Sequence, residues 1–83
     1  MVKLVFLGKF RGLAREDANI VLPAQVQTLA ELKDWIASND PPLGRAMAAM
    51  PVQYVVNQSV VRDLSCLIQE QDEVAFLPPM SGG

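Results

Sequence analysis

The sequence predicts a small α+β domain in which a mixed β-sheet packs against one main helix. A run of mostly apolar residues with a composition typical of strands lies near each end of the chain, at Val2–Leu7 and at Glu73–Leu77. Between them, Thr28 to Glu31 has the sequence of a capping box and begins an amphipathic helix. With 83 residues, of which 51% are hydrophobic, the chain is sufficient for one domain with its own core.

The first strand has apolar residues on both of its faces. Alternation places Val2, Leu4 and Phe6 on one face, while Val5 and Leu7 make the other face apolar as well. Such a strand either lies at the centre of a sheet with both faces covered by other elements, or leaves an apolar interaction surface exposed to solvent.

The next segments along the chain predict a hairpin. A polar connection, Phe10–Asp17, with room for a helical turn, leads to a second short strand at Asn19–Leu22, which Pro23 ends. These first two strands are close enough in sequence to pair with each other through a long loop.

The main helix is expected to run from Leu29 to about Ser38 or Asn39, with Leu29, Leu32 and Ile36 as its buried stripe. Asp40-Pro41-Pro42 is expected to terminate it.

A weaker helical pattern covers Leu43–Met50, and Gln53–Asn57 is a third strand. Val60 and Val61, with Leu64 and Ile68, anchor the loops before the last strand, and the element order leaves room for a further short strand there. On that last strand, Val74 and Phe76 point one way and Ala75 and Leu77 the other.

This order of elements favours a β-grasp topology, in which the first and last strands pair in parallel at the centre of the sheet. The two-faced first strand suits that position. We therefore expect a β-grasp domain over residues 1–77 and a projecting C-terminal tail over residues 78–83.

Composition excludes several classes of function. Seven basic and nine acidic residues give a net charge of −2 with no basic run, so no nucleic-acid partner is expected. With no His and a single Cys66, the chain lacks the residues for His/Cys zinc sites and for Ser/His/Asp or Cys/His catalysis. No segment reads as a signal peptide or a membrane span, which predicts a cytoplasmic protein.

The C-terminal Gly82-Gly83 is hard to explain by stability, because glycine gains nothing by packing and costs the most entropy to order. Two residues without Cβ atoms make a thin tail that can enter a narrow channel in another protein. Pro78-Pro79 would stiffen its base, although the prolines can also be simple strand terminators. A frayed chain end is the alternative reading of the diglycine.

Three segments together resemble the small subunits of molybdopterin synthase, which are ubiquitin-like sulfur carriers of molybdenum-cofactor synthesis. They are Val55–Gln58, the opening Val2–Arg11, and above all the terminal Asp72–Gly83 with its Asp-Glu-Val-Ala-Phe-x-Pro-Pro-x-x-Gly-Gly pattern. Leu77 departs from the second Phe that this family often carries. Gln71 departs from a common Gly, which implies strain if the turn needs a positive φ.

The resemblance implies a definite chemistry for the chain end. An E1-like enzyme would use ATP to adenylate the Gly83 carboxylate, and a persulfide-based sulfur donor would convert the acyl-adenylate to a thiocarboxylate. The large subunit would accept Gly82-Gly83 in its active site, where sulfur passes to precursor Z and two carriers in turn complete the dithiolene. The chain would then be a non-catalytic subunit of a heterotetramer, with no bound cofactor or metal and no enzyme activity of its own.

Partner contacts are expected on the outward sheet face and along the tail, although face residues packed within the domain, or a solvated Arg11, are the alternatives. Cys66 is expected to be a core or loop residue, since sulfur travels on the chain end. The expected contact residues are Leu7, Arg11, Ala75, Leu77, Pro78, Pro79, Met80 and Ser81.

Two other functions remain open at this stage. A sulfur carrier for thiazole formation has the same fold, but the Phe76–Pro79 segment favours the molybdopterin synthase resemblance. A ubiquitin-like modifier conjugated to lysines through Gly83 would begin with the same adenylate. An independent enzyme is disfavoured because the chain has neither His nor a phosphate-binding loop.

Overall fold

The computed structural model describes residues 1–14 and 18–78. Three helices and five strands lie within them. In chain order they are β1 (Val2–Phe6), α1 (Lys9–Ala14), β2 (Ala18–Ile20), α2 (Leu29–Asn39), α3 (Pro41–Ala49), β3 (Gln53–Val56), β4 (Ser59–Val61) and β5 (Glu73–Leu77).

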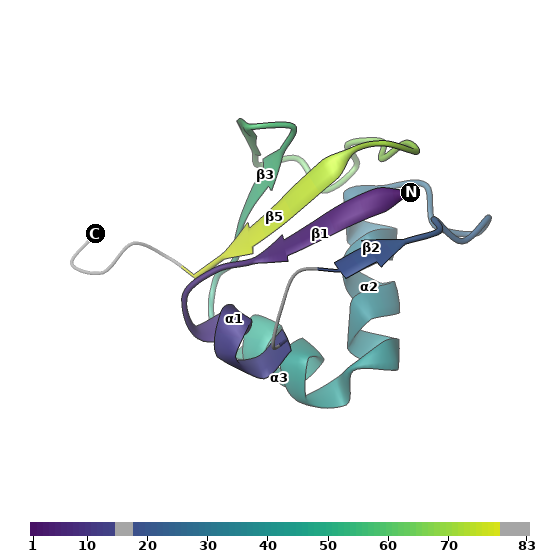
Figure 1. Ribbon diagram of the computed structural model, residues 1–83. Coiled ribbons are helices and arrows are strands. Elements are labelled where there is room, and N and C mark those ends of the chain that lie inside the picture. The colour runs from purple at the N-terminus through teal and green to yellow at the C-terminus, as the bar shows by residue number, and fades with distance from the viewer. Residues whose placement is uncertain (15–17, 79–83) are drawn as a thin grey trace.

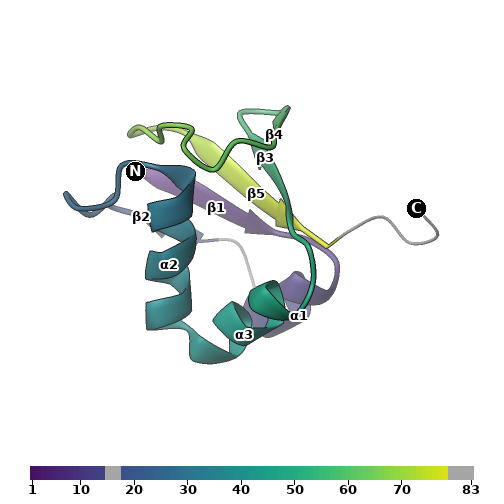
Figure 2. The same cartoon turned by 180° about the vertical axis from the view of Figure 1, so that it is seen from behind.

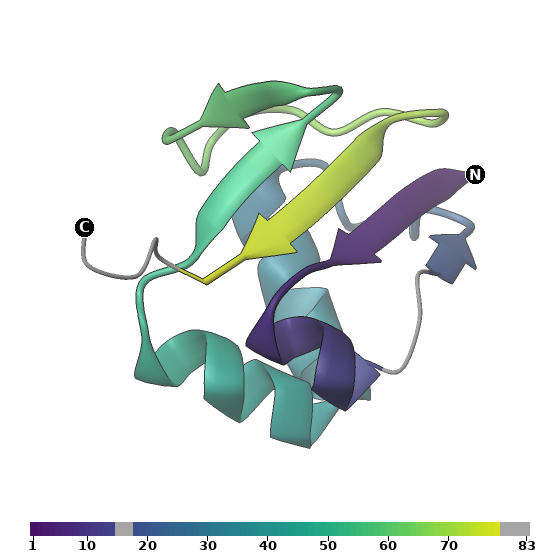
Figure 3. The ribbon, with the colours of Figure 1, turned by 60° about the vertical axis from the view of Figure 1, so that its left-hand side comes forward.

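The strands form one mixed sheet in the order β2-β1-β5-β3-β4. β1 and β5 are parallel, with Leu4 opposite Val74, and the remaining neighbours are antiparallel. Figure 3 shows β1 and β5 side by side at the centre of the sheet. The predicted β-grasp topology is therefore confirmed, including the hairpin of β1 with β2.

The core lies between the sheet and the helices. Figures 1 and 2 show all three helices on the same side of the sheet, with α2 running behind β1 and α1 and α3 near the end where β5 stops. Val2, Leu4 and Phe6 point into this core from β1, as their alternation predicts. Val74 and Phe76 join them from β5, and both are fully buried.

The capping box of α2 is confirmed. The Glu31 amide donates to Thr28 Oγ1 at 3.2 Å, and Glu31 Oε1 accepts from the amides of Thr28 and Gln27. These backbone hydrogen bonds, that of Gln27 first, hold the pKa of Glu31 below its usual value. The predicted stripe of α2 is buried, and α2 ends at Asn39.

The expectation for Asp40 and the two prolines was only half right. Asp40 does end α2, since its amide donates to the Ile36 carbonyl at 2.8 Å. However, α3 begins directly afterwards at Pro41 and not at Leu43, and the Asp40 side chain accepts from the Leu43 amide. Proline is well tolerated in the first turn of a helix, where its missing N–H has no partner to lose, so it starts helices as well as ending them.

Three shorter segments agree with expectation only in part. The connection after β1 forms α1 from Lys9, and Phe10 is fully buried in the core. The second strand is Ala18–Ile20 and ends before Leu22, while Val60 and Val61 belong to the edge strand β4. Elements this short carry too few periods for their pattern to be read from sequence.

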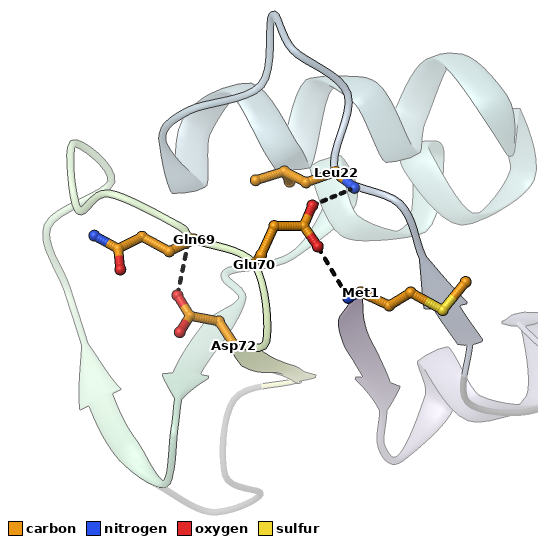
Figure 4. Close-up of polar contacts among 5 residues, drawn as sticks. All are labelled: Met1, Leu22, Gln69, Glu70 and Asp72. Carbon is orange, nitrogen blue, oxygen red and sulfur yellow. Dashed lines mark hydrogen bonds and ion pairs between the residues drawn. The ribbon is translucent and has the colours of Figure 1, made fainter.

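The start of β1 is tied to the turn before β5. The amino group of Met1 lies 2.9 Å from Glu70 Oε2, and Glu70 Oε1 accepts from the Leu22 amide at 3.2 Å (Figure 4). The Gln71 amide donates to the Met1 carbonyl at 3.0 Å. Gln71 has a φ of 75°, so the condition for strain at this position is met: a non-glycine residue stands in the left-handed region.

Candidate functional site at the end of the last strand

β5 is hydrogen-bonded on both sides up to the point where the predicted tail begins. β3 pairs with it as far as Leu77, and the Leu7 amide donates to the Phe76 carbonyl at 3.0 Å. The Phe76 ring stacks on Phe6 with centroids 5.1 Å apart and meets the Tyr54 ring edge-on at 5.8 Å. The tail therefore starts from a rigid platform at the centre of the sheet.

Pro78 is the last described residue and is half-buried. Its ring lies against the backbone of Gly8, because a Cβ placed on Gly8 would be 2.8 Å from Pro78 Cγ. The remaining predicted tail residues lie outside the described part of the chain, so their roles stay predictions. They are Pro79, Met80, Ser81, Gly82 and Gly83.

The sheet face turned away from the helices carries an apolar row across four strands. The strand register places Val5 opposite Ala75, Ala75 opposite Val55, and Val55 opposite Val60. None of the four belongs to the core cluster. Val60 is 54% exposed, and Val5 and Val55 are half-buried. We call these four residues the outer row.

The predicted partner-binding residues are not equally available on this face. Leu77 lies two residues after Ala75, shares its face and is half-buried. Leu7, which follows β1, is also half-buried. Ala75 is only 8% exposed, because valines on both neighbouring strands flank it. Arg11 is exposed in α1.

Sequence reasoning did not include Val55 and Val60 among the contact residues. The alternation within Gln53–Val56 places Val55 on the face opposite Tyr54 and Val56, which is a signal that the sequence does contain. However, joining it to Val60 and Ala75 in one row requires the register across three strands, and the sequence does not give that register.

The interior of the described residues is apolar. Within residues 1–14 and 18–78, no polar or charged side chain is buried, and no three His, Cys, Asp or Glu side chains are placed to hold a metal ion. Cys66 is half-buried in a loop, as expected, with its Sγ 3.6 Å from the Leu67 carbonyl. Among the same residues, no helix is long and apolar enough to cross a membrane.

A shallow pocket of about 380 Å³ lies beside α2. It contains none of the predicted site residues, so it does not change the position of the candidate site. Its lining residues are Gln25, Val26, Glu31, Asp34, Trp35 and Ser38.

Comparison with known proteins places the chain among small carrier proteins. The ThiS family profile matches residues 4–83. The molybdopterin synthase sulfur carrier subunit of Escherichia coli is 31% identical over 83 residues, a match that covers 100% of both chains.

Two solved structures share the fold. A chain of the complex of subunits 1 and 2 of the molybdopterin-converting factor of Helicobacter pylori superposes with a TM-score of 0.69 at 20% identity, covering 99% of this chain and 97% of that one. Small archaeal modifier protein 1 of Methanosarcina acetivorans superposes with a TM-score of 0.75 at 19% identity, covering 99% and 95%.

The central parallel pair, the helix packed on one sheet face and these structural matches define a ubiquitin-like β-grasp protein. Within that class, the chain belongs to the ThiS family. The resemblance to small subunits of molybdopterin synthase is confirmed by the full-length match to the E. coli subunit.

Proposed function

We propose that this chain is a sulfur carrier and the small subunit of a molybdopterin synthase. The observation that carries the proposal is the match to the E. coli sulfur carrier subunit, which covers the whole of both chains and so includes the Gly82-Gly83 terminus. The described structure supports it, because the last strand is paired up to Leu77 and so holds the base of the terminal segment in the sheet.

The proposed chemistry takes place on the main-chain carboxylate of Gly83. A carboxylate is a poor electrophile, so its oxygen first attacks the α-phosphate of ATP in an E1-like partner, and pyrophosphate leaves. The terminal sulfur of a donor persulfide then displaces AMP from the acyl-adenylate and forms an acyl disulfide. A second thiol of the donor system attacks the donor's own sulfur, which releases the thiocarboxylate and leaves a disulfide on the donor. That group is the soft nucleophile that delivers sulfur to precursor Z in the large subunit.

The folded domain supports this chemistry by offering a binding surface to the partner and by holding the base of the tail. From Pro78 to Gly83 the chain reaches about 20 Å when fully extended, at ~3.3 Å per residue, which is long enough to enter a neighbour's active site. The outer row, with Leu7 and Leu77 beside it, is an apolar surface that the large subunit would cover. Gly82 would pass through the narrowest part of the channel, because it has no side chain to exclude it.

The proposal is tested by altering the terminus alone. Deletion of Gly83, or extension by one alanine beyond it, is expected to abolish dithiolene formation by the reconstituted synthase. The unfolding midpoint and circular dichroism of both variants should match the wild-type chain, because neither change touches β5. Normal dithiolene formation by either variant would refute the role of Gly83.

Two alternatives share the fold and remain open. A ubiquitin-like modifier would yield isopeptide-linked adducts of Gly83 with lysines of other proteins, and a thiazole-pathway carrier would co-purify with a different acceptor enzyme. Affinity purification of the tagged chain, followed by mass analysis of both the partner and the Gly83 end, separates the three. Recovery of the synthase large subunit without isopeptide adducts is the expected result.

A further inference from the structure

Gly8 and Pro78 are in contact at the point where the chain leaves the sheet. Gly8 lies between β1 and α1 and has a φ of 60°, in the left-handed region that favours glycine. A Cβ at this position would lie 2.8 Å from Pro78 Cγ and 3.0 Å from Pro78 Cδ. The proline ring therefore occupies the space that any side chain at residue 8 would need.

Two separate requirements for glycine coincide at residue 8. The positive φ allows the chain to turn from β1 into α1, where the Arg11 amide donates to the Gly8 carbonyl at 3.1 Å. That requirement is local, and it would be the same whatever followed Leu77. The close approach of Pro78 is a second requirement, and it concerns only the segment that leads to the terminus.

The backbone at Pro78 is restricted on both sides of its ring. A proline ring fixes its own φ near −65° and holds the preceding residue, Leu77, in an extended conformation. Residue 79 is also a proline, so Pro78 is itself restricted to extended ψ values. With Leu77 paired to Gln53 on one side and Pro78 against Gly8 on the other, little rotational freedom is left at the base of the tail.

We propose that Gly8 is a positioning residue for the C-terminal tail: its bare backbone is the seat of the Pro78 ring and sets the direction in which Gly83 is presented to partner enzymes. This assignment rests on the proposed function, since it supposes that Gly83 is the reacting residue. The role assigned to Gly8 is to orient the terminus, whereas the reaction itself takes place at Gly83.

The test measures adenylation of the full-length chain by its activating enzyme, followed as ATP-dependent pyrophosphate release. Gly8→Ala displaces the proline ring, so a smaller fraction of the chains presents the terminus in a competent direction. Apparent affinity falls in proportion to that fraction. We expect KM to rise about tenfold with kcat nearly unchanged, as for a chain whose competent fraction falls about tenfold.

A substitution at Pro78 separates the effect of the Gly8–Pro78 contact from the effect of the positive φ at Gly8. Pro78→Ala removes the Cγ and Cδ atoms and should by itself raise KM, because the ring no longer fixes the base of the tail. In that background Gly8→Ala should raise KM no further, because nothing remains for its Cβ to displace. Equal effects of Gly8→Ala with and without the proline ring would overturn the assignment, as would a wild-type KM for either single variant.

Gly44→Ala is the matched control. A Cβ on Gly44 would lie 2.7 Å from both Cα and Cβ of Ala37, so this variant also places a methyl group in a space that is already filled, but between α2 and α3. It should lower the melting temperature and leave KM at the wild-type value. A rise in KM equal to that of Gly8→Ala would mean that general destabilisation explains both. If the wild-type chain is not adenylated at all, the proposed function fails, and this assignment fails with it.

Discussion

Asn57 and Asp72 close the end of the sheet opposite the tail, with Asn57 Nδ2 donating to Asp72 Oδ1 at 2.9 Å. Asn57 Oδ1 accepts from the Glu73 amide at 2.9 Å, and the Asn57 amide donates to the Glu73 carbonyl at 2.8 Å. On its other side, Asp72 Oδ2 accepts from the Gln69 amide at 2.8 Å (Figure 4). The β3–β4 turn and the entry to β5 are thereby joined.

This contact divides the terminal sequence pattern into two parts. Asn57, Asp72 and Glu73, which carried much of the resemblance seen in the sequence, hold the start of β5 in register. Leu77 and Pro78 lie at the other end, where the strand gives way to the tail. One short pattern therefore contains both the residues that fix the last strand and the residues that present the terminus.

Replacement of Asn57 by alanine is expected to lower the free energy of unfolding by about 3 kcal/mol, of which about 2 comes from lost hydrogen bonds and about 1 from backbone strain. The change removes two side-chain hydrogen bonds worth about 1 kcal/mol each and leaves an alanine at a φ of 50°. Urea unfolding measures the loss. Asn57→Gly, which loses the same bonds without the backbone strain, should be the less damaged variant, and the reverse order would contradict this reading.

Gly44→Ala is expected to destabilise the fold by about 1–3 kcal/mol, the usual cost of overpacking. The new methyl group would meet the Ala37 backbone and Cβ at 2.7 Å, where α2 and α3 cross. A helix interior would otherwise gain from the change, since alanine is the better helix former by about 1 kcal/mol. Thermal unfolding gives the sign, and a stabilised variant would show that the two helices can separate without cost.

Leu77→Glu is expected to weaken binding to the synthase large subunit by about tenfold, because it places a charge within the proposed apolar contact. Leu67→Glu is the matched control. Leu67 is 63% exposed in the loop that follows β4, away from the outer row. Calorimetric titration measures the affinity of each variant for the large subunit. Equal affinities of the Leu77 and Leu67 variants would show that Leu77 is not part of the interface.

Glu70→Gln is expected to lower stability at neutral pH by a small amount that disappears in acid. The hydrogen bond from the amino group of Met1, first among its causes, holds the pKa of Glu70 below the ordinary value of 4.5. A carboxylate with a lowered pKa in the folded state stabilises the protein above its ordinary pKa, and this contribution is lost as the pH falls through the lowered value. Melting temperatures of wild type and variant should therefore converge well below pH 4.5.

Because the ion pair is exposed, high salt at neutral pH should also narrow the difference in melting temperature between wild type and variant. A gap that persists in acid would mean that the Glu70 charge is not its cause.

The elements best predicted from sequence are those whose pattern is local. The capping box at Thr28 fixed the start of α2, and the run Glu73–Leu77 matched β5 residue for residue. The parallel pairing of β1 and β5 was predicted from the order of the elements, and a first strand that is apolar on both faces suits it. The start of α3 was missed because a proline that ends one helix can also begin the next, and the sequence alone does not say which.

The candidate site was predicted in its type but not in its details. Leu7 and Leu77 were identified by alternation, whereas Val55 and Val60 needed the register of β3 against β4 and β5. The seat at Gly8 could not be predicted, because it depends on a through-space contact between opposite ends of the chain. Alternation along one strand gives faces, and only the folded sheet gives neighbours.

The chemical state of the Gly83 carboxylate tests the central claim most directly. The full-length chain, produced together with its activating enzyme and a persulfide donor, would be analysed by intact mass spectrometry, with the Gly83 deletion variant as the control. We expect a gain that corresponds to replacement of one oxygen by sulfur, located at Gly83 by fragmentation and absent from the variant. An unmodified carboxylate under these conditions, or a terminus found only in isopeptide linkage to lysine, would contradict the account.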